Sequence, residues 1–398
     1  MGSTTTAAAT PQDTGQLAVA LGHQAIVVNA LEALGVRSSV ADTSPELGLA
    51  LLNLHEDDVR STAGSAKKPL DEVLRRLYAH FKQLYKSDWV PTIGKNRTVD
   101  RVGAAAPKHN IGGGGEGLPQ TLTAEQRPRY ERPATGPTPT VAIADTRIYA
   151  HPALAGSYLA SEAGPFGEVD GPFPYHAGHA TFVAGLVLQW APLARLEIYP
   201  VLDENGEAES WELAKRLVRL SRSGVDVLNL SLGCLTDDDE PPLVLATAID
   251  RLDLGTVVVA SAGNHAAVAS DRPKPMWPAA LDDVVAVGAV TRKGKAPTWS
   301  QTPERAPWID VVAPGVDVRS TFLSGAVRLP HPPPPDLPAG DRLPDEFDGY
   351  AAWSGTSFAA ATVSGAIAHV VAGERDARTA LEELRAGKLH ADALRWNA

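Results

Sequence analysis

From residue 140 onward the chain alternates between short, continuous apolar runs and longer segments of helical periodicity, and this alternation most restricts its fold. The apolar runs are rich in Val and Ile, and an unbroken run of this kind is typical of a strand buried on both faces. They read TVAIA, LEIYPVL, VDVLNLSL, TVVVASA, VVAVGAV and IDVVAP. The helical segments between them include ATFVAGLVLQWA, SWELAKRLVRLSRSG and PLVLATAIDRLDLG. The pattern predicts an α/β domain with a mostly parallel central sheet and helices on both faces.

The chain before this domain predicts three further parts. Residues 1–20 are rich in Thr and Ala and are expected to be disordered. Residues 21–95 predict strand, helix, strand, strand and helix, which suits a small α+β domain. These elements correspond to QAIVVN, ALEALGV, RSSVAD, LGLALLNL and PLDEVLRRLYAHFKQL. Residues 96–139 are rich in Gly, Pro and charge and predict a flexible linker, and the α/β domain at 140–398 carries a proline-rich insertion at 326–348. The insertion is interpreted as a stiff spacer, with partner docking or covering of a cleft as the alternatives.

Charge and cysteine content exclude several classes of function. The net charge is −11, from 36 basic and 47 acidic residues, which argues against nucleic acid and against an anionic membrane surface as partners. No stretch of 18 apolar residues predicts a membrane span. Cys234 is the single cysteine, so no intrachain disulfide is possible, and it is interpreted as a small packed residue. The first residues do not have the pattern of a secretory signal, so a cytoplasmic location is expected.

Polar residues follow the predicted strands, where ligands bind in open α/β sheets. Asp145 comes directly after TVAIA, and Asn264 comes soon after TVVVASA. His176 and His179 precede a predicted helix. Two imidazoles three residues apart could be metal ligands, an acid/base pair, or one catalytic group beside a histidine that takes no part. Ser357 begins a late helix, and a serine at such a position is either an N-cap or a nucleophile. For a nucleophile, the positive end of the helix dipole would face the negative charge that develops near the hydroxyl during the reaction.

Four sequence blocks together resemble the subtilisin-like serine proteases, the subtilases of peptidase family S8. They are A-D-T at 144–146, H-A-T-F-V-A-G at 179–185, S-A-G-N at 261–264 and G-T-S-F-A at 355–359. The resemblance covers about residues 140–372 and implies a three-layer subtilisin-like domain. It also implies a serine endopeptidase that hydrolyses peptide or protein substrates through an acyl-enzyme without an organic cofactor.

The resemblance assigns roles to individual residues. Asp145 would orient the base, His179 would be the general base and then the acid, and Ser357 would be the nucleophile. Asn264 would donate its side-chain amide to the oxyanion, beside the backbone N–H of Ser357. Two segments would bind substrate. The first would pair with an extended peptide, and both would form the walls of the primary specificity pocket. These segments are Ser231, Leu232 and Gly233, and Ser261, Ala262 and Gly263. Their small side chains predict room for a large or apolar substrate side chain.

Departures from the family pattern leave two other hypotheses open. Arg147, Ala180 and Ala361 stand where the family usually has Gly, Gly and Pro. Arg147 and the proline-rich insertion support a catalytically inactive, peptide-binding member of the fold. A metallohydrolase would rest on the histidine pair alone, and the chain lacks H-E-x-x-H. Subtilases often hold structural calcium, but the acidic run at 237–240 is interpreted as a solvated loop, so no metal site is assigned.

The family also gives the amino-terminal region a possible role. Many subtilases carry a ferredoxin-like prodomain that assists folding and then inhibits the active site. The element order over 21–95 is compatible with such a prodomain, and a partner-binding or localisation domain is the alternative. Intramolecular inhibition is expected if the first interpretation holds, and the linker at 96–139 would then be the place of processing.

Overall fold

The structure, a computed structural model, describes most of the chain and divides it into two compact units. The described residues are 13–101, 118–130, 136, 138–164, 172–203, 205–220, 224–266, 273–329, 345–372, 376–386 and 395–396. The smaller unit comprises Met1–Val99, Glu209–Arg219 and Thr236–Leu252, and the larger unit comprises Asp100–Ala208, Leu220–Leu235 and Asp253–Ala398.

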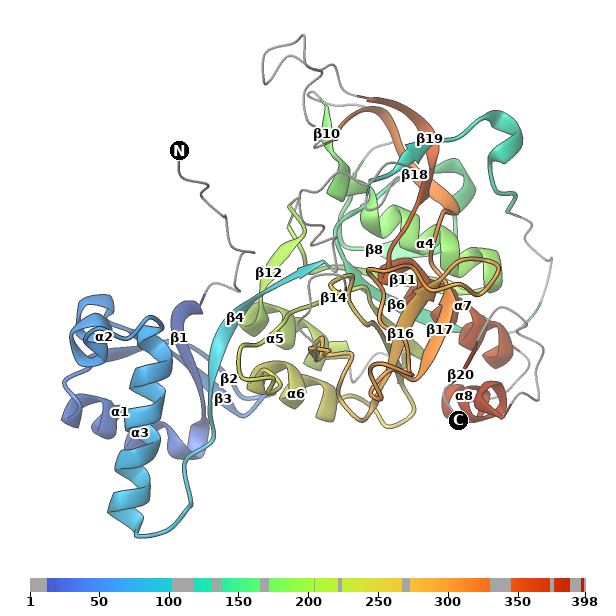
Figure 1. The fold of residues 1–398 in the computed structure, drawn as a ribbon. Coiled ribbons are helices and arrows are strands. Elements are labelled where there is room, and N and C mark those ends of the chain that lie inside the picture. The colour runs from blue at the N-terminus through green and yellow to red at the C-terminus, as the bar shows by residue number, and fades with distance from the viewer. Residues whose placement is uncertain are drawn as a thin grey trace. The chain divides into compact units, whose positions relative to one another are not determined.

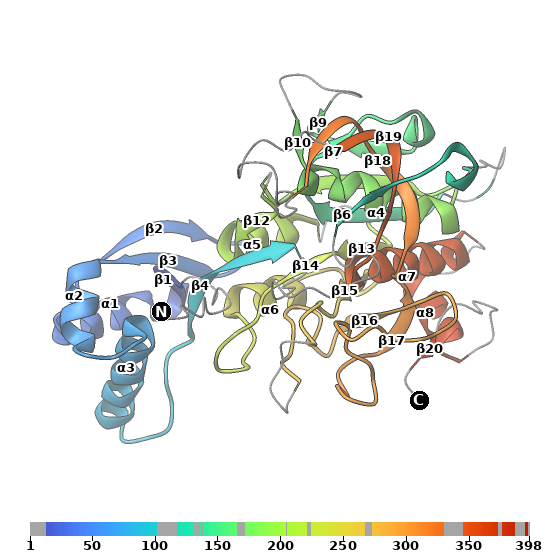
Figure 2. The same ribbon diagram turned by 45° about the horizontal axis from the view of Figure 1, so that its top comes forward.

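The smaller unit is built on an antiparallel sheet with strand order β4-β1-β3-β2 (Figure 2). Buried side chains from β1, β3, α1 and α3 form its hydrophobic core, which includes Leu17, Leu31, Leu52 and Phe81. Along the chain the elements follow the order β, α, β, β, α, β, which is the ferredoxin-like topology, with one extra short helix. The elements are β1 (Asp13–Ala20), α1 (Gln24–Ala33), β2 (Ser38–Ser44), β3 (Leu49–Leu54), α2 (Glu56–Ala63), α3 (Pro69–Tyr85) and β4 (Ile93–Arg101).

Three predictions for this region are wrong. Residues 13–20 form β1 and are not disordered, because hydrogen bonding to both β3 and β4 places Leu17 and Val19 in the core. QAIVVN lies in helix α1 and not in a strand, since a short apolar run does not distinguish a buried helix from a strand by periodicity. The first residues of the predicted linker belong to β4.

Two helices from later in the sequence complete the smaller unit. They are α5 (Ser210–Leu220) and α6 (Leu243–Asp250). Asn96 Oδ1 on β4 accepts hydrogen bonds from Ser210 Oγ and from the backbone N–H of Trp211, both at 2.9 Å. A β-carbon built at Gly94 would lie 2.5 Å from Leu243 Cβ, so β4 approaches α6 as closely as a glycine allows.

Charged groups join the same elements of the smaller unit. Lys215 Nζ and Trp211 Nε1 donate to Asp42 at 2.6 and 2.9 Å, and these bonds lower the pKa of Asp42 to about 2. The acidic run at 237–240 is not simply solvated, because Lys68 pairs with Asp237 and Arg97 pairs with Asp238. The run therefore contributes to packing within the unit.

The larger unit contains the predicted mostly parallel sheet, with strand order β20-β17-β16-β15-β13-β6-β11-β8 (Figure 1). Every described pairing in it is parallel except that of β20 with β17. The strands are β6 (Thr140–Asp145), β8 (Tyr158–Ala160), β11 (Arg195–Pro200), β13 (Val227–Leu230), β15 (Val257–Ser261), β16 (Val284–Val290), β17 (Val311–Pro314) and β20 (Arg395–Trp396). The central strands are buried along their length, as their unbroken apolar sequences predict.

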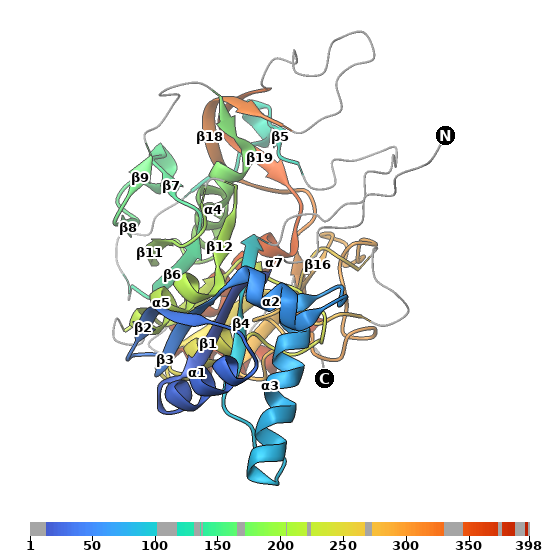
Figure 3. The same cartoon turned by 90° about the vertical axis from the view of Figure 1, so that its left-hand side faces the viewer.

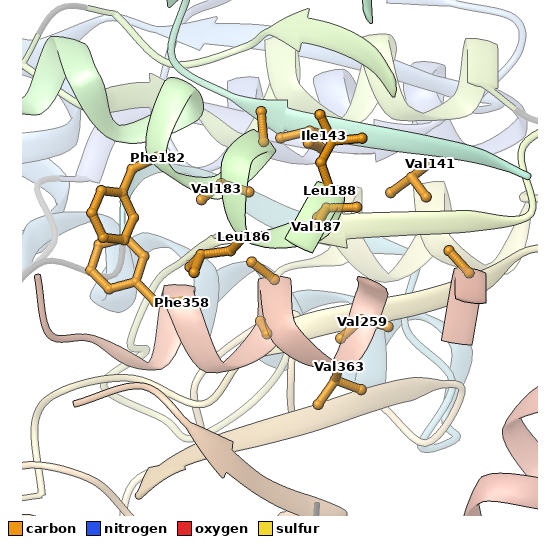
Figure 4. Close-up of a cluster of buried hydrophobic side chains, with 14 of the residues drawn as sticks. Val141, Ile143, Phe182, Val183, Leu186, Val187, Leu188, Val259, Phe358 and Val363 are labelled. Atoms are coloured by element: carbon orange, nitrogen blue, oxygen red, sulfur yellow. The ribbon is translucent and has the colours of Figure 1, made fainter. Parts of the chain in front are cut away.

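Helices α4 (His179–Trp190) and α7 (Thr356–Val371) pack against each other and against this sheet. Figure 4 shows their apolar side chains meeting those of the strands, with Phe182 of α4 in contact with Phe358 of α7. A third helix, α8 (Ala377–Arg385), contacts α7. Among the described residues no helix is long and apolar enough to span a membrane.

A second, smaller sheet of the larger unit was not predicted (Figure 3). Its strands are, in spatial order, β10 (Phe173–Pro174), β18 (Val318–Arg328), β19 (Asp345–Trp353) and β5 (Gln120–Thr121). Both ends of the predicted insertion at 326–348 therefore belong to strands, whereas residues 330–344 lie outside the described part of the chain. The remaining short strands are β7 (Ile148–Tyr149), β9 (Ala163–Gly164), β12 (Glu207–Glu209) and β14 (Leu232–Gly233).

Candidate active site

The end of β6 and the start of α4 bring a carboxylate and an imidazole together in the larger unit. Both oxygens of Asp145 lie 2.8 Å from His179 Nδ1, and the two side chains are buried. The backbone N–H of Thr146 donates to Asp145 Oδ1 at 2.6 Å and holds the carboxylate in place. Because an ionised carboxylate only accepts hydrogen bonds, Nδ1 carries the proton and Nε2 faces the other way.

Ser357 lies in the first turn of α7 and is 1% exposed. Its hydroxyl donates to the carbonyl oxygen of Ser231 at 3.3 Å, and Ser231 Oγ donates to the carbonyl of Ser357 at 2.9 Å. The N-cap of the helix is Gly355, so the interpretation of Ser357 as an N-cap is wrong. The phenyl ring of the next residue, Phe358, lies 5.4 Å from the imidazole of His179 between centroids. The fold thus places the helix start that carries Ser357 beside the Asp145–His179 pair.

Asn264 is held against the same helix start. Its Oδ1 accepts from the backbone N–H and from the hydroxyl of Thr356, both at 3.0 Å. Thr356 Oγ1 in turn accepts from the backbone N–H of Gly263 at 3.1 Å. These bonds fix the amide, and Nδ2 then lies on the side of Gly355, 3.6 Å from a β-carbon built there.

The imidazole of His179 also contacts aromatic rings that the sequence did not single out. Trp353, at the end of β19, meets it in a T-shaped arrangement with centroids 5.7 Å apart. Trp353 further contacts Phe358 and Phe182, with centroids 5.0 and 5.6 Å apart. Trp353 lies just before the G-T-S-F-A block, separated from it by Ser354, but no rule of spacing marks that position in the sequence.

The predicted peptide-binding strand is already paired with another part of the chain. Leu232 and Gly233 form β14, which pairs antiparallel with the last two residues of β4. In this register Leu232 is opposite Arg101 and Gly233 is opposite Asp100. The sequence missed this pairing because these two residues fall in the predicted linker.

Arg147 and His176 support the hypotheses of an inactive peptide-binding protein and of a metallohydrolase, and their surroundings differ from those of His179. The side chain of Arg147 is exposed. The ring of His176 contacts that of Tyr175 at an angle of 50°, with centroids 3.6 Å apart, whereas His179 bonds Asp145. Within the described ranges no group of three His, Cys, Asp or Glu side chains has the arrangement of a metal site. Cys234 is buried, and its backbone pairs with that of Trp277.

Comparisons with known proteins identify the family of the chain. A family model described as the subtilase family matches residues 136–391. The chain is 31% identical over 237 residues to the thermophilic serine proteinase of Bacillus sp. (strain AK1), covering 56% of this chain and 50% of that protein. It is 30% identical over 270 residues to subtilisin BL of Lederbergia lenta, covering 64% of this chain and 84% of that protein. The protease domain of PatA, solved as a serine-to-alanine mutant, is 26% identical with a TM-score of 0.44, covering 63% of this chain and 81% of that one.

The family match extends over more than half of the chain, and the chain therefore belongs to the subtilase family. The match spans about half the length of the Bacillus AK1 proteinase.

Proposed function

We propose that this protein is a serine endopeptidase that cleaves peptide bonds through an acyl-enzyme. One observation carries the proposal: the buried Asp145 carboxylate lies 2.8 Å from His179 Nδ1, beside the helix start that holds Ser357. A carboxylate, an imidazole and a serine hydroxyl are the groups that acyl transfer requires. Family membership adds independent support.

In the proposed mechanism Ser357 Oγ turns from the Ser231 carbonyl and attacks the carbonyl carbon of the scissile bond. His179 Nε2 takes the hydroxyl proton as the C–O bond forms, and it passes that proton to the amine nitrogen as the C–N bond breaks. Water then repeats the sequence and releases the acid. Asp145 stabilises the imidazolium in both halves. The chain's own side chains supply all of this chemistry, so the proposal includes no organic cofactor and no metal.

Charge on the carbonyl oxygen would be stabilised by two fixed donors. These are Asn264 Nδ2 and the backbone N–H of Ser357 in the first turn of α7. The positive end of the helix dipole favours negative charge at the same place. Thr356 donates two hydrogen bonds to Asn264 Oδ1, so Asn264 Nδ2 is oriented before substrate binds. Such preorganisation is what efficient transition-state stabilisation requires.

The end of β4, at Asp100 and Arg101, is proposed to inhibit the site until the chain is cut. Asp100 and Arg101 pair with β14, the strand on which an extended substrate would form its backbone hydrogen bonds. A peptide substrate could not pair with Leu232 and Gly233 while this segment remains there. The ferredoxin-like topology of the smaller unit is also the one that family prodomains have.

Labelling with a fluorophosphonate probe tests the proposed nucleophile. We expect the wild-type protein to react at Ser357 and the Ser357→Ala variant not to react, with mass spectrometry locating the adduct. Ser364→Ala is the matched control, because Ser364 is a buried serine of the same helix and bonds Asn229 instead. Labelling of Ser357→Ala equal to wild type, or no labelling of wild type, would contradict the proposal and favour an inactive peptide-binding protein.

A further inference from the structure

We infer that Met276 fills the primary specificity pocket, so that this enzyme cleaves after small residues. The inference rests on the proposed function, since it concerns which peptide the same site accepts. It also reverses the expectation from sequence, which took the small residues on both pocket walls as room for a large side chain.

The thioether of Met276 lies against both predicted walls. A β-carbon built at Gly233 would lie 2.8 Å from Met276 Sδ and 3.0 Å from its Cγ. A β-carbon built at Gly263 would lie 2.8 Å from Met276 Cε. One side chain therefore extends from one wall to the other. It is 7% exposed, so it occupies this space and does not project into solvent.

Backbone pairing fixes the position of Met276. The N–H of Cys234 donates to the carbonyl of Trp277 at 2.9 Å, and the N–H of Trp277 donates to the carbonyl of Cys234 at 3.0 Å. This bridge is antiparallel and fixes the backbone directly after Met276, and from there the Met276 side chain reaches Gly233 by the contacts given above. The position of the residue is thus determined by the fold, even though its side chain is flexible.

A second buried side chain narrows the pocket at the other wall. Nδ1 of His265 would lie 2.4 Å from a β-carbon built at Gly263. His265 Nε2 lies 3.0 Å from the carbonyl oxygen of Lys274 and 2.9 Å from Gln301 Nε2, so the ring is held from behind. Burial lowers the pKa of His265, which leaves the ring neutral near pH 7. This wall therefore offers no positive charge that would attract an acidic substrate side chain.

The filled pocket sets the expected substrate class. A Gly, Ala or Ser before the scissile bond needs little of the space that Met276 occupies. A Leu or Phe would have to displace the thioether from its contacts with both walls. A misfit of a single methylene in a pocket already changes kcat/KM by about 10–200-fold.

Inactivation by peptidyl diphenyl phosphonates measures this preference at the same serine. We would compare two phosphonates that differ only in the residue attached to phosphorus, Ala against Phe, using protein made as the full chain and then cut within residues 96–139, where processing is proposed. For wild type we expect the Ala compound to inactivate about 10-fold faster or more. For Met276→Gly we expect the Phe compound to gain about 10-fold or more while the Ala compound changes about 3-fold or less.

Met276→Leu is the matched control, because it keeps the volume and should keep the preference for Ala. A small fluorophosphonate, which needs no pocket, would be run on every variant. If wild type fails to react with it, the proposed function fails. If wild type reacts with it but accepts Phe as well as Ala, the inference on Met276 is overturned while the proposed function stands. The wild-type comparison decides this even where Met276→Gly does not fold.

Discussion

His179 is surrounded by groups of different character on its two sides. Its Nδ1 is tied to the buried carboxylate of Asp145, and its ring lies against the aromatic rings of Trp353 and Phe358. An aromatic ring within about 6 Å favours a nearby cation, so these rings suit the imidazolium that proton transfer creates. His176, three residues earlier, contacts Tyr175 and is partly exposed. The two histidines therefore have different surroundings despite their closeness in sequence, which supports separate roles in the proposed mechanism.

Replacing each histidine separately tests this assignment. We expect His179→Ala to lower kcat by about 10⁶-fold, which is the loss that removal of the triad histidine causes in subtilisin, a member of the same family. His176→Ala should lower kcat/KM about 3-fold or less, since the ring contact with Tyr175 is lost while the Asp145–His179 pair is kept. Peptide hydrolysis measured on both purified variants, with circular dichroism as a check of folding, decides the point. Equal losses in both would refute the separation of roles.

At the scale of elements, α4 and α7, which carry the proposed base and the proposed nucleophile, pack against each other. His179 begins α4, and Ser357 lies in the first turn of α7. Farther along α7, Gly365 approaches α4 so closely that a β-carbon there would lie 2.8 Å from Trp190 Cβ and 2.9 Å from the carbonyl oxygen of Val187. Backbone atoms and a Cβ cannot move aside as a flexible side chain would. A glycine is therefore required here by packing and not by backbone conformation.

Gly365→Ala should separate the two helices. A gain of about 1 kcal/mol in helix propensity is offset by an overpacking cost of about 1–3 kcal/mol. We expect the free energy of unfolding to fall by up to about 2 kcal/mol and kcat to fall with it, because the helices carry His179 and Ser357. Urea unfolding and peptide hydrolysis would be measured together. Gly22→Ala is the control, since a β-carbon there meets no atom within 4 Å. A stabilised Gly365→Ala protein would show that the contact is not tight.

At the scale of the whole molecule, the amino-terminal region and the family domain share chain segments. Helices α5 and α6 come from the later sequence but pack within the smaller unit with the sheet of residues 13–99. Conversely, Asp100 and Arg101 pair with β14 in the larger unit. In the proposed mechanism, the chain therefore blocks its own peptide-binding strand with Asp100 and Arg101. Release of that occupant is then expected to control activity.

Self-processing tests this expectation. We expect the wild-type protein to be cut within residues 96–139, and the Ser357→Ala variant to remain intact. Because the cut segment belongs to the same chain as the site, the fraction cut per unit time should not depend on protein concentration. Gel electrophoresis with terminal sequencing over a dilution series of about 100-fold measures this. A rate that rises in proportion to concentration would mean that processing occurs between molecules and would argue against intramolecular inhibition.

Much of the larger unit was predictable because its signals are local. The Val- and Ile-rich runs became buried parallel strands, and the segment after His179 became a helix. In the smaller unit the local signals were weaker. The strand at 13–20 depends on bonds to β3 and β4, which lie far along the chain, so a window of a few residues does not reveal it. The long pair β18 and β19 was missed for a similar reason, because its strands flank the proline-rich segment.

The sequence by itself determined the family, the parallel sheet and the identity of the candidate reacting groups. The sheet follows from continuous apolar runs, and the family and the reacting groups follow from short motifs at strand ends and helix starts. Only the tertiary structure decided what surrounds those groups. It brought Trp353 to His179, Asp100 and Arg101 to β14, and Met276 between Gly233 and Gly263. These neighbours come from distant parts of the chain through backbone pairing and core packing. No short sequence pattern shows which of them will meet, and under the proposals made above they determine which peptide the site accepts.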